Sequence, residues 1–245
     1  MATKMEAVIF DNDNTIAKIY PNPKVYWKDV FVKTVEECGG SIPKGKEEEY
    51  MLSYFTNKGF LDKLETIGLK TTWSHFQKMK GVVDERERVR YIRSGHSKLF
   101  PDAVKLMREL HEMKIKYAVA TFTTKTVVLE AFTQIPGLHP PDAFFDWNDS
   151  LRDKLEKPNP RIAKIVLDKL RVSPKKAMMV GDRLTDIQMG NMAGMWTALV
   201  KRKAEDGALV DQMEREIETA RRDPETSHIV PDYQVTDLSQ IRDIL

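Results

Sequence analysis

Short apolar runs, in which polar and apolar residues do not alternate, constrain the fold of this 245-residue chain more than any other feature. Four runs are each followed by polar or small residues: Ala7–Phe10, Tyr117–Ala120, Ala177–Val180 and Trp196–Val200. Strands with this pattern are buried on both faces, which is typical of a parallel sheet covered by helices. The runs therefore predict an α/β fold.

Helical patterns lie between several of these runs. Helices are expected to begin at Pro101, at Pro160 and after Asp182, where apolar residues follow at helical spacing. A last short strand is expected at Tyr233–Val235. This alternation of strand and helix predicts a doubly wound, mostly parallel sheet with right-handed crossovers.

The segment 17–96 breaks the alternation. It is rich in charge and in apolar residues at helical spacing, and it contains no comparable apolar run. We expect an α-helical domain of these residues, inserted into an α/β core of residues 1–16 and 97–245. A second charged excursion, Lys203–Asp223, is expected to be helical and precedes the last strand.

Composition excludes several classes of protein. The chain has 39 Lys and Arg against 37 Asp and Glu, a net charge of +2, which gives no electrostatic case for a nucleic acid or an anionic membrane as partner. No apolar run approaches the roughly 18 residues of a membrane span, and no secretory signal is visible. The single cysteine, Cys38, cannot form an internal disulfide. We expect a cytoplasmic protein that binds neither membrane nor nucleic acid.

Polar clusters follow the predicted strands. Asp11–Thr15 comes after the first run, Thr121–Thr123 after the second and Gly181–Asp186 after the third, and Lys157–Asn159 precedes the Pro160 helix. In an open parallel sheet, ligands bind beyond the carboxyl ends of the strands. We therefore expect these clusters to converge on one edge of the sheet.

The charges of these clusters favour a metal. Asp11, Asp13, Asp182 and Asp186 would bring four carboxylates together, with Lys157 as the one nearby cation. Such carboxylates would repel one another or take up protons. A hard divalent cation relieves this, and oxygen ligands without His or Cys favour Mg²⁺ over zinc. A site of this kind suits a phosphate dianion.

The spacing of the first two aspartates indicates their roles. Asp11 and Asp13 are two residues apart, so an extended backbone places both carboxylates on the same side. One can attack phosphorus while the other protonates the leaving oxygen and later deprotonates the water that cleaves the aspartyl-phosphate. Asp182 would ligate the metal, and Asp186, one helical turn further, lies on the same face.

The remaining candidates are contacts to the phosphoryl group. Thr121 and the backbone N–H groups that follow it, beginning with Phe122, are expected to bind phosphoryl oxygens, with Thr123 as the second choice for the hydroxyl. Lys157 is expected to screen the nucleophile and the transferring group.

These motifs resemble those of the haloacid dehalogenase-like hydrolase superfamily. Phe10–Thr15 is similar to its first motif, Asp-x-Asp-x-Thr/Val after an apolar strand. Thr121 matches the second motif, Lys157–Pro160 the third and Gly181–Asp186 the fourth, in the same order.

The resemblance implies a Rossmann-like core and a mobile α-helical cap, as in the phosphoglycolate-phosphatase-like members. It implies Mg²⁺-dependent hydrolysis of a phosphoester through an aspartyl-phosphate, with the backbone carbonyl at Asp13 as a further metal ligand. The expected substrate is a small phosphorylated metabolite, such as phosphoglycolate or a sugar phosphate, and the expected protein is a monomer or homodimer.

Two departures leave alternatives open. Asn14 stands where the family usually has glycine, and Phe122 replaces a common polar residue. Together with the Lys203–Asp223 excursion, they leave open a non-catalytic module that binds a phosphorylated ligand or a partner. A phosphosugar mutase is a separate alternative, because a phosphorylated aspartate that is retained against water would convert hydrolysis into transfer. Lys201–Lys203 is expected to be either a solvated helix start or an attractor of anionic substrates.

Overall fold

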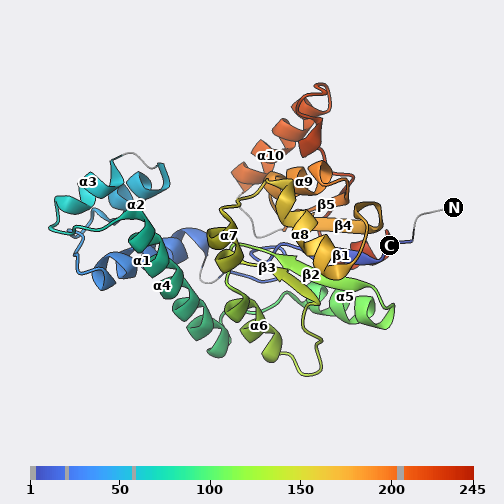
Figure 1. Cartoon of the computed structure of the whole chain (residues 1–245), viewed down its shortest axis with the longest axis horizontal. Coiled ribbons are helices and arrows are strands. Elements are labelled where there is room, and N and C mark those ends of the chain that lie inside the picture. The colour runs from blue at the N-terminus through green and yellow to red at the C-terminus, as the bar shows by residue number, and fades with distance from the viewer. Residues whose placement is uncertain (1–3, 20–21, 57–58, 203–206) are drawn as a thin grey trace. The chain divides into compact units, whose positions relative to one another are not determined.

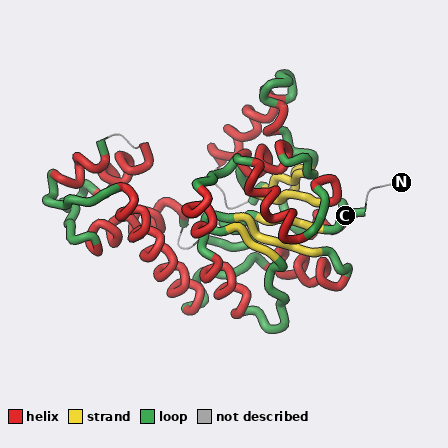
Figure 2. Tube along the Cα trace, in the orientation of Figure 1, coloured by secondary structure: helices red, strands yellow, loops and turns green. Residues whose placement is uncertain are grey.

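The computed structural model describes residues 4–19, 22–56, 59–202 and 207–245 of the chain. It divides into two compact units (Figures 1 and 2). Met1–Lys18 and Lys98–Leu245 form one, called the core unit below, and Ile19–Ser97 forms the other, called the helical unit.

The core unit contains a six-stranded, all-parallel sheet in the order β3-β2-β1-β4-β5-β6. The strands are β1 (Ala7–Phe10), β2 (Lys116–Ala120), β3 (Ala143–Phe145), β4 (Ala177–Gly181), β5 (Trp196–Val200) and β6 (Tyr233–Val235). This confirms the predicted doubly wound α/β fold. The chain adds β2 and β3 on one side of β1 and then β4, β5 and β6 on the other, so the strand order reverses between β1 and β4.

One strand, β3, is absent from the sequence-based prediction. It has three residues and lies at the edge of the sheet beside β2. Its place is fixed by pairing, since Ala143 lies opposite Ala118, and the Asp142 carboxylate accepts a hydrogen bond from the backbone N–H of Tyr117 at 2.9 Å. Contacts between residues that are distant in the sequence leave no local pattern in it.

The helices of the core unit are α5 (Pro101–Glu112), α6 (Lys125–Thr133), α7 (Trp147–Asp153), α8 (Pro160–Leu170), α9 (Leu184–Met192), α10 (Gly207–Ala220) and α11 (Ser239–Arg242), with 3₁₀ turns at Pro174–Lys176 and Ser227–Ile229. The predicted helical excursion Lys203–Asp223 contains α10, while its residues 203–206 lie outside the described residues. Within the described part of the chain, no helix has the length and apolar character needed to cross a membrane.

Helices α8 and α9 cover one face of the sheet. Ile162 and Val166 of α8 belong to the same buried cluster as Ile9, Ala118 and Met179 of three adjacent strands. Helix α5 packs against β2 and α11. Figure 2 shows the strands enclosed by helices, which explains why their residues are apolar without alternation.

The helical unit consists of α1 (Pro23–Glu37), α2 (Glu47–Thr56), α3 (Phe60–Glu65) and α4 (Trp73–Arg93). One buried cluster is rich in aromatic residues and includes Phe31, Tyr54, Phe60 and Phe76, drawn from all four helices.

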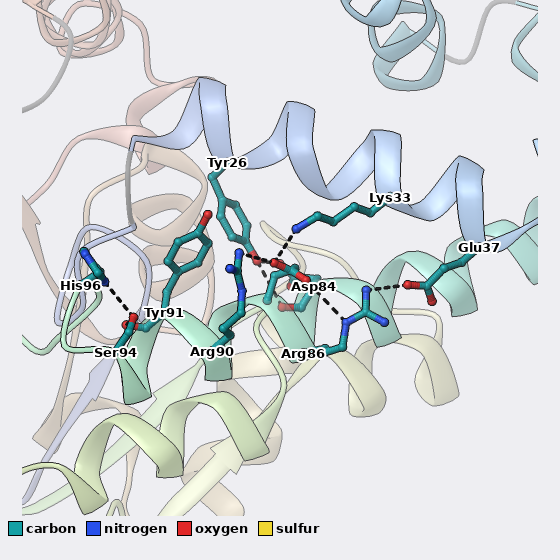
Figure 3. A network of polar contacts seen from close by, with 10 residues as sticks. Tyr26, Lys33, Glu37, Asp84, Arg86, Arg90, Tyr91, Ser94 and His96 are labelled. Atoms are coloured by element: carbon teal, nitrogen blue, oxygen red, sulfur yellow. Dashed lines mark hydrogen bonds and ion pairs between the residues drawn. The ribbon is translucent and has the colours of Figure 1, made fainter. Parts of the chain in front are cut away.

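Polar contacts join α1 to α4 (Figure 3). The Tyr26 hydroxyl donates a hydrogen bond to the buried Asp84 carboxylate at 2.6 Å, and Asp84 also accepts one from Arg88 at 3.0 Å. An ion pair of 2.5 Å links Arg86 of α4 to Glu37 of α1. The helical unit thus has its own core and its own buried polar contacts.

Gly190 of α9 lies in tight contact with β4 and β5. A Cβ atom at this position would lie 2.7 Å from Cγ2 of Thr197 and 2.8 Å from Cβ of Met179. In an open helix, replacing glycine by alanine stabilises a protein by up to about 1 kcal/mol. Here the added methyl group would overpack the contact, which typically costs about 1–3 kcal/mol.

We therefore expect Gly190→Ala to lower the free energy of unfolding in urea. Met192→Ala, at a half-exposed position on the same helix, serves as the control and should change it little. A more stable Gly190→Ala variant would contradict the packing of α9 on β4 and β5.

Candidate active site

The candidate site lies where the strand order reverses. Phe10 at the end of β1 pairs with Val180 of β4 on one side and Val119 of β2 on the other. The residues that follow these strands therefore emerge side by side, and the backbone N–H of Asp11 donates to the carbonyl of Val180 at 2.9 Å. The reversal opens a crevice at this edge in doubly wound sheets.

Three carboxylates meet at this edge. Asp11, Asp182 and Asp186 each place one oxygen within 4.8 Å of the others. All three residues are buried, with exposed fractions of 7%, 3% and 1%. Four carboxylates were expected to converge here, and the structure groups three of them, without Asp13.

Local backbone structure fixes Asp186. The backbone N–H of Arg183, which precedes α9, donates to Oδ2 of Asp186 at 3.3 Å. Gly181 leaves room for this carboxylate, because a Cβ atom at residue 181 would lie 2.5 Å from Cβ and Cγ of Asp186. Glycine at the end of β4 is thus required by the position of Asp186.

Lys157 joins two of the carboxylates. Its Nζ lies 2.6 Å from Oδ1 of Asp11 and 2.7 Å from Oδ1 of Asp186, and its side chain is 7% exposed. Burial alone would lower the pKa of Lys157, but the two carboxylates outweigh this and raise it. The lysine is therefore a fixed positive charge beside Asp11.

The same surroundings act on Asp11. Burial is the largest effect and raises its pKa, Lys157 opposes it, and the carboxylates of Asp186 and Asp13 add to it, so that the pKa of Asp11 reaches about 7. The metal-free site therefore holds more negative charge than Lys157 can neutralise once Asp11 ionises.

This donor set fits a hard divalent cation. The site offers three buried carboxylate oxygens at close range and an excess of negative charge. Oxygen ligands of this kind suit Mg²⁺, which binds through a few carboxylates and keeps part of its water. The Arg183 Nε, 3.4 Å from Oδ2 of Asp182 on a half-exposed side chain, offsets the charge only at the edge of the site.

Asp13 lies outside the group of three carboxylates. Its Oδ2 accepts a hydrogen bond from the Thr123 hydroxyl at 3.1 Å, and its Oδ1 accepts one from the Asn12 amide at 2.8 Å. Asn14, which follows, has a φ of 56°, the left-handed conformation that asparagine tolerates better than most residues. The turn that places Asp13 thus forms without the glycine common in the family.

The residues after β2 have distinct environments. Thr121 is buried, and its hydroxyl oxygen accepts a hydrogen bond from the backbone N–H of Thr123 at 3.0 Å. The Phe122 side chain is 39% exposed, and the Nζ of Lys157 lies 5.8 Å from the centre of its ring. The loop therefore presents an aromatic ring beside the lysine.

Sequence reasoning missed several contacts of the site. The Thr15 hydroxyl donates to Oδ1 of Asp182 at 3.4 Å, and Thr123 contacts Asp13 instead of serving as a substitute for Thr121. Arg202, predicted as part of a solvated helix start or an attractor of anions, is instead buried against Asp102. Its neighbour Lys203 lies outside the described residues.

The ionisation of Asp11 generates a prediction for the chelated protein. Because the pKa is raised from 3.8 to about 7, the folded state keeps a proton that the unfolded state loses first. We expect the contribution of Asp11 to stability to be present below about pH 4 and lost as the pH rises through about 7.

In the presence of a chelator, Asp11→Asn should abolish this dependence of stability on pH. Above about pH 7 it should be more stable than the natural protein, by on the order of 2–4 kcal/mol at most. Urea unfolding across the pH range measures this, and Asp168→Asn, at an exposed position on α8, is the matched control. Parallel pH profiles for the natural protein and Asp11→Asn would contradict the raised pKa.

Comparison with known proteins agrees with this geometry. The family model described as haloacid dehalogenase-like hydrolase matches residues 5–194, and a related HAD-hydrolase-like model matches residues 155–241. The chain is 29% identical over 152 residues to a glyceraldehyde 3-phosphate phosphatase of Methanopyrus kandleri, a match that covers 62% of this chain and 58% of that protein.

A second relative is the phosphorylated carbohydrates phosphatase of Thermotoga maritima, 25% identical over 194 residues, with 78% of this chain and 82% of that protein covered. Among solved structures, a HAD phosphatase from Thermococcus onnurineus has the same fold, with a TM-score of 0.65, 21% identity and coverage of 98% and 97% of the two chains. The chain belongs to the haloacid dehalogenase-like hydrolase family.

Proposed function

We propose that the protein is an Mg²⁺-dependent phosphatase that hydrolyses a small phosphorylated metabolite through an aspartyl-phosphate on Asp11. One observation carries the proposal. A buried lysine lies 2.6 Å from Asp11 and 2.7 Å from Asp186, at the edge of the sheet where Asp182 completes a group of three carboxylates. This arrangement supports phosphoryl transfer better than it supports structure alone, because buried like charges are costly without a ligand.

The proposed reaction has two steps. An oxygen of Asp11 attacks phosphorus, the bond from phosphorus to the leaving oxygen breaks, and Asp13 gives its proton to that oxygen. Water then attacks phosphorus and gives a proton to Asp13. The bond between phosphorus and Asp11 breaks, which releases inorganic phosphate and restores both side chains.

The surroundings of Asp13 support its role as acid and base. Thr123 and Asn12 each hold one of its oxygens, so its carboxyl group is oriented before substrate arrives. Lys157 is proposed to bind phosphoryl oxygens in addition to its ion pair with Asp11. Thr121 and the backbone N–H of Phe122 are proposed to bind the remaining phosphoryl oxygens.

Asp11, Asp182 and Asp186 would hold magnesium, with Asp13 contributing its backbone carbonyl as the family resemblance implies. When bound, the ion supplies positive charge that offsets the charge of a phosphate dianion. The chain's own part is to keep these oxygens close together, which Gly181 and Lys157 do for Asp186.

Phosphorylated carbohydrates and related metabolites are the proposed substrates. The two relatives described above are named for glyceraldehyde 3-phosphate and for phosphorylated carbohydrates. Residues 17–96 are proposed to act as a cap that restricts the substrates by size and excludes water. Phosphoglycolate remains a candidate within this class.

We expect turnover of a panel of sugar phosphates, triose phosphates, phosphoglycolate and an aryl phosphate to require Mg²⁺ and to stop in chelator. Asp11→Asn should lower turnover by at least about 1000-fold, because it removes the nucleophile. Asp168→Asn should retain full activity. Released inorganic phosphate is the measurement.

Other outcomes of this panel favour the alternatives. An isomerised sugar phosphate without free phosphate, detected by phosphorus NMR, would indicate a mutase. Tight binding of a phosphorylated ligand without turnover of any substrate would indicate a non-catalytic module. Undiminished hydrolysis by Asp11→Asn would contradict the nucleophile.

A further inference from the structure

Arg202 follows β5 and is buried at a distance from the carboxylates described above. Its side chain is 10% exposed, and its Nη1 lies 2.5 Å from Oδ2 of Asp102, which is equally buried. Its Nη2 donates to the backbone carbonyl of Thr15 at 2.5 Å, and its guanidinium lies 4.0 Å from the centre of the Phe100 ring. One side chain therefore contacts the loop after β1 and the start of α5.

The partner of Arg202 is itself fixed. Oδ2 of Asp102 also accepts a hydrogen bond from the backbone N–H of Leu238 at 2.8 Å, just before α11. The backbone N–H of Phe100 donates to the carbonyl of Ile16 at 2.9 Å. Two consecutive carbonyls of the loop after β1, those of Thr15 and Ile16, thus accept hydrogen bonds from Arg202 and from Phe100.

Thr15 links this contact to the candidate site. It is fully buried, its carbonyl accepts from Arg202, and its hydroxyl donates to Oδ1 of Asp182 at 3.4 Å. A shift of the Thr15 backbone would move the donor away from Asp182. Contacts that orient a metal ligand in this way typically change metal affinity when they are removed.

We propose that Arg202 is a positioning residue that fixes Thr15 and, through the Thr15 hydroxyl, the carboxylate of Asp182. This inference rests on the proposed function, in which Asp182 holds magnesium. Among the described residues, Arg202 contacts Asp102, Thr15 and Phe100, so its effect on Asp182 is indirect.

The geometry requires arginine. Two nitrogens of one planar group bind a carboxylate and a carbonyl from different segments, and the guanidinium carbon lies 4.0 Å from the centre of the Phe100 ring. Lysine would keep the charge but has neither the fork of donors nor a flat face. Arg202→Lys should therefore be intermediate between the natural protein and Arg202→Met.

A purely structural role for Arg202 makes a different prediction. If Arg202 only connected α5 to the C-terminal segment, its loss would lower the stability of the protein without changing the affinity for Mg²⁺. Arg88 offers a matched control, since its ion pair with Asp84 in the helical unit is as buried as that of Arg202, with side chains 9% and 8% exposed.

The test measures the Mg²⁺ dissociation constant by calorimetry and the unfolding midpoint for the natural protein, Arg202→Met, Arg202→Lys, Thr15→Val, the Arg202→Met/Thr15→Val double variant and Arg88→Met. We expect Thr15→Val to weaken Mg²⁺ binding by about 10-fold or more, and Arg202→Met and then Arg202→Lys to weaken it by successively smaller factors. Arg88→Met should lower the unfolding midpoint while leaving Mg²⁺ affinity unchanged.

The double variant tests the route through Thr15. Adding Arg202→Met to Thr15→Val should weaken Mg²⁺ binding by much less than it does in the natural protein, because the hydroxyl that carries the effect is already gone. Additive losses would overturn the route through Thr15, and an unchanged Mg²⁺ affinity in folded Arg202→Met or Arg202→Lys would overturn the positioning role. A natural protein that binds no Mg²⁺ would instead refute the proposed metal site, and the inference with it.

Discussion

The ion pairs of Lys157 with Asp11 and Asp186 are the interaction on which the candidate site depends. They join the end of β1 to the start of α9 through a residue that lies before α8, with distances of 2.6 Å and 2.7 Å. Without this lysine, three buried carboxylates would face one another with little compensation. With it, Asp11 and Asp186 are held close together, and the negative charge that remains favours the binding of a cation.

The sheet makes this meeting possible. Because β1 lies between β2 and β4, the loops that carry Asp11, Thr121 and Asp182 leave the sheet next to one another although they are far apart in sequence. Small residues then allow close approach, with Gly181 making room for Asp186 and Gly190 letting α9 contact β4 and β5. The backbone therefore determines the spacing of the acidic groups, and the side chains supply the chemistry.

Much of this could be predicted from the sequence because the carboxyl ends of parallel strands always share an edge. That rule placed Asp11, Asp182 and Asp186 together, although Asp13, expected with them, lies outside the group. The tolerance of asparagine for positive φ anticipated the turn at Asn14. The burial of Arg202 could not be predicted, since it depends on contacts with Thr15 and Asp102, which are distant in the sequence. From the sequence alone, the basic run at Lys201–Lys203 is expected to be exposed to solvent. In the fold, Arg202 is buried in an ion pair with Asp102.

The central claim is that Asp11 carries the phosphoryl group during turnover. Asp13→Asn should form this aspartyl-phosphate from an aryl phosphate, whose leaving oxygen needs little help from an acid, and should hydrolyse it slowly for want of a base. Acid quenching followed by mass spectrometry of the peptides would locate the phosphoryl group. We predict its mass on Asp11; a phosphoryl group on another residue, or turnover without any phosphorylated protein, would contradict the account.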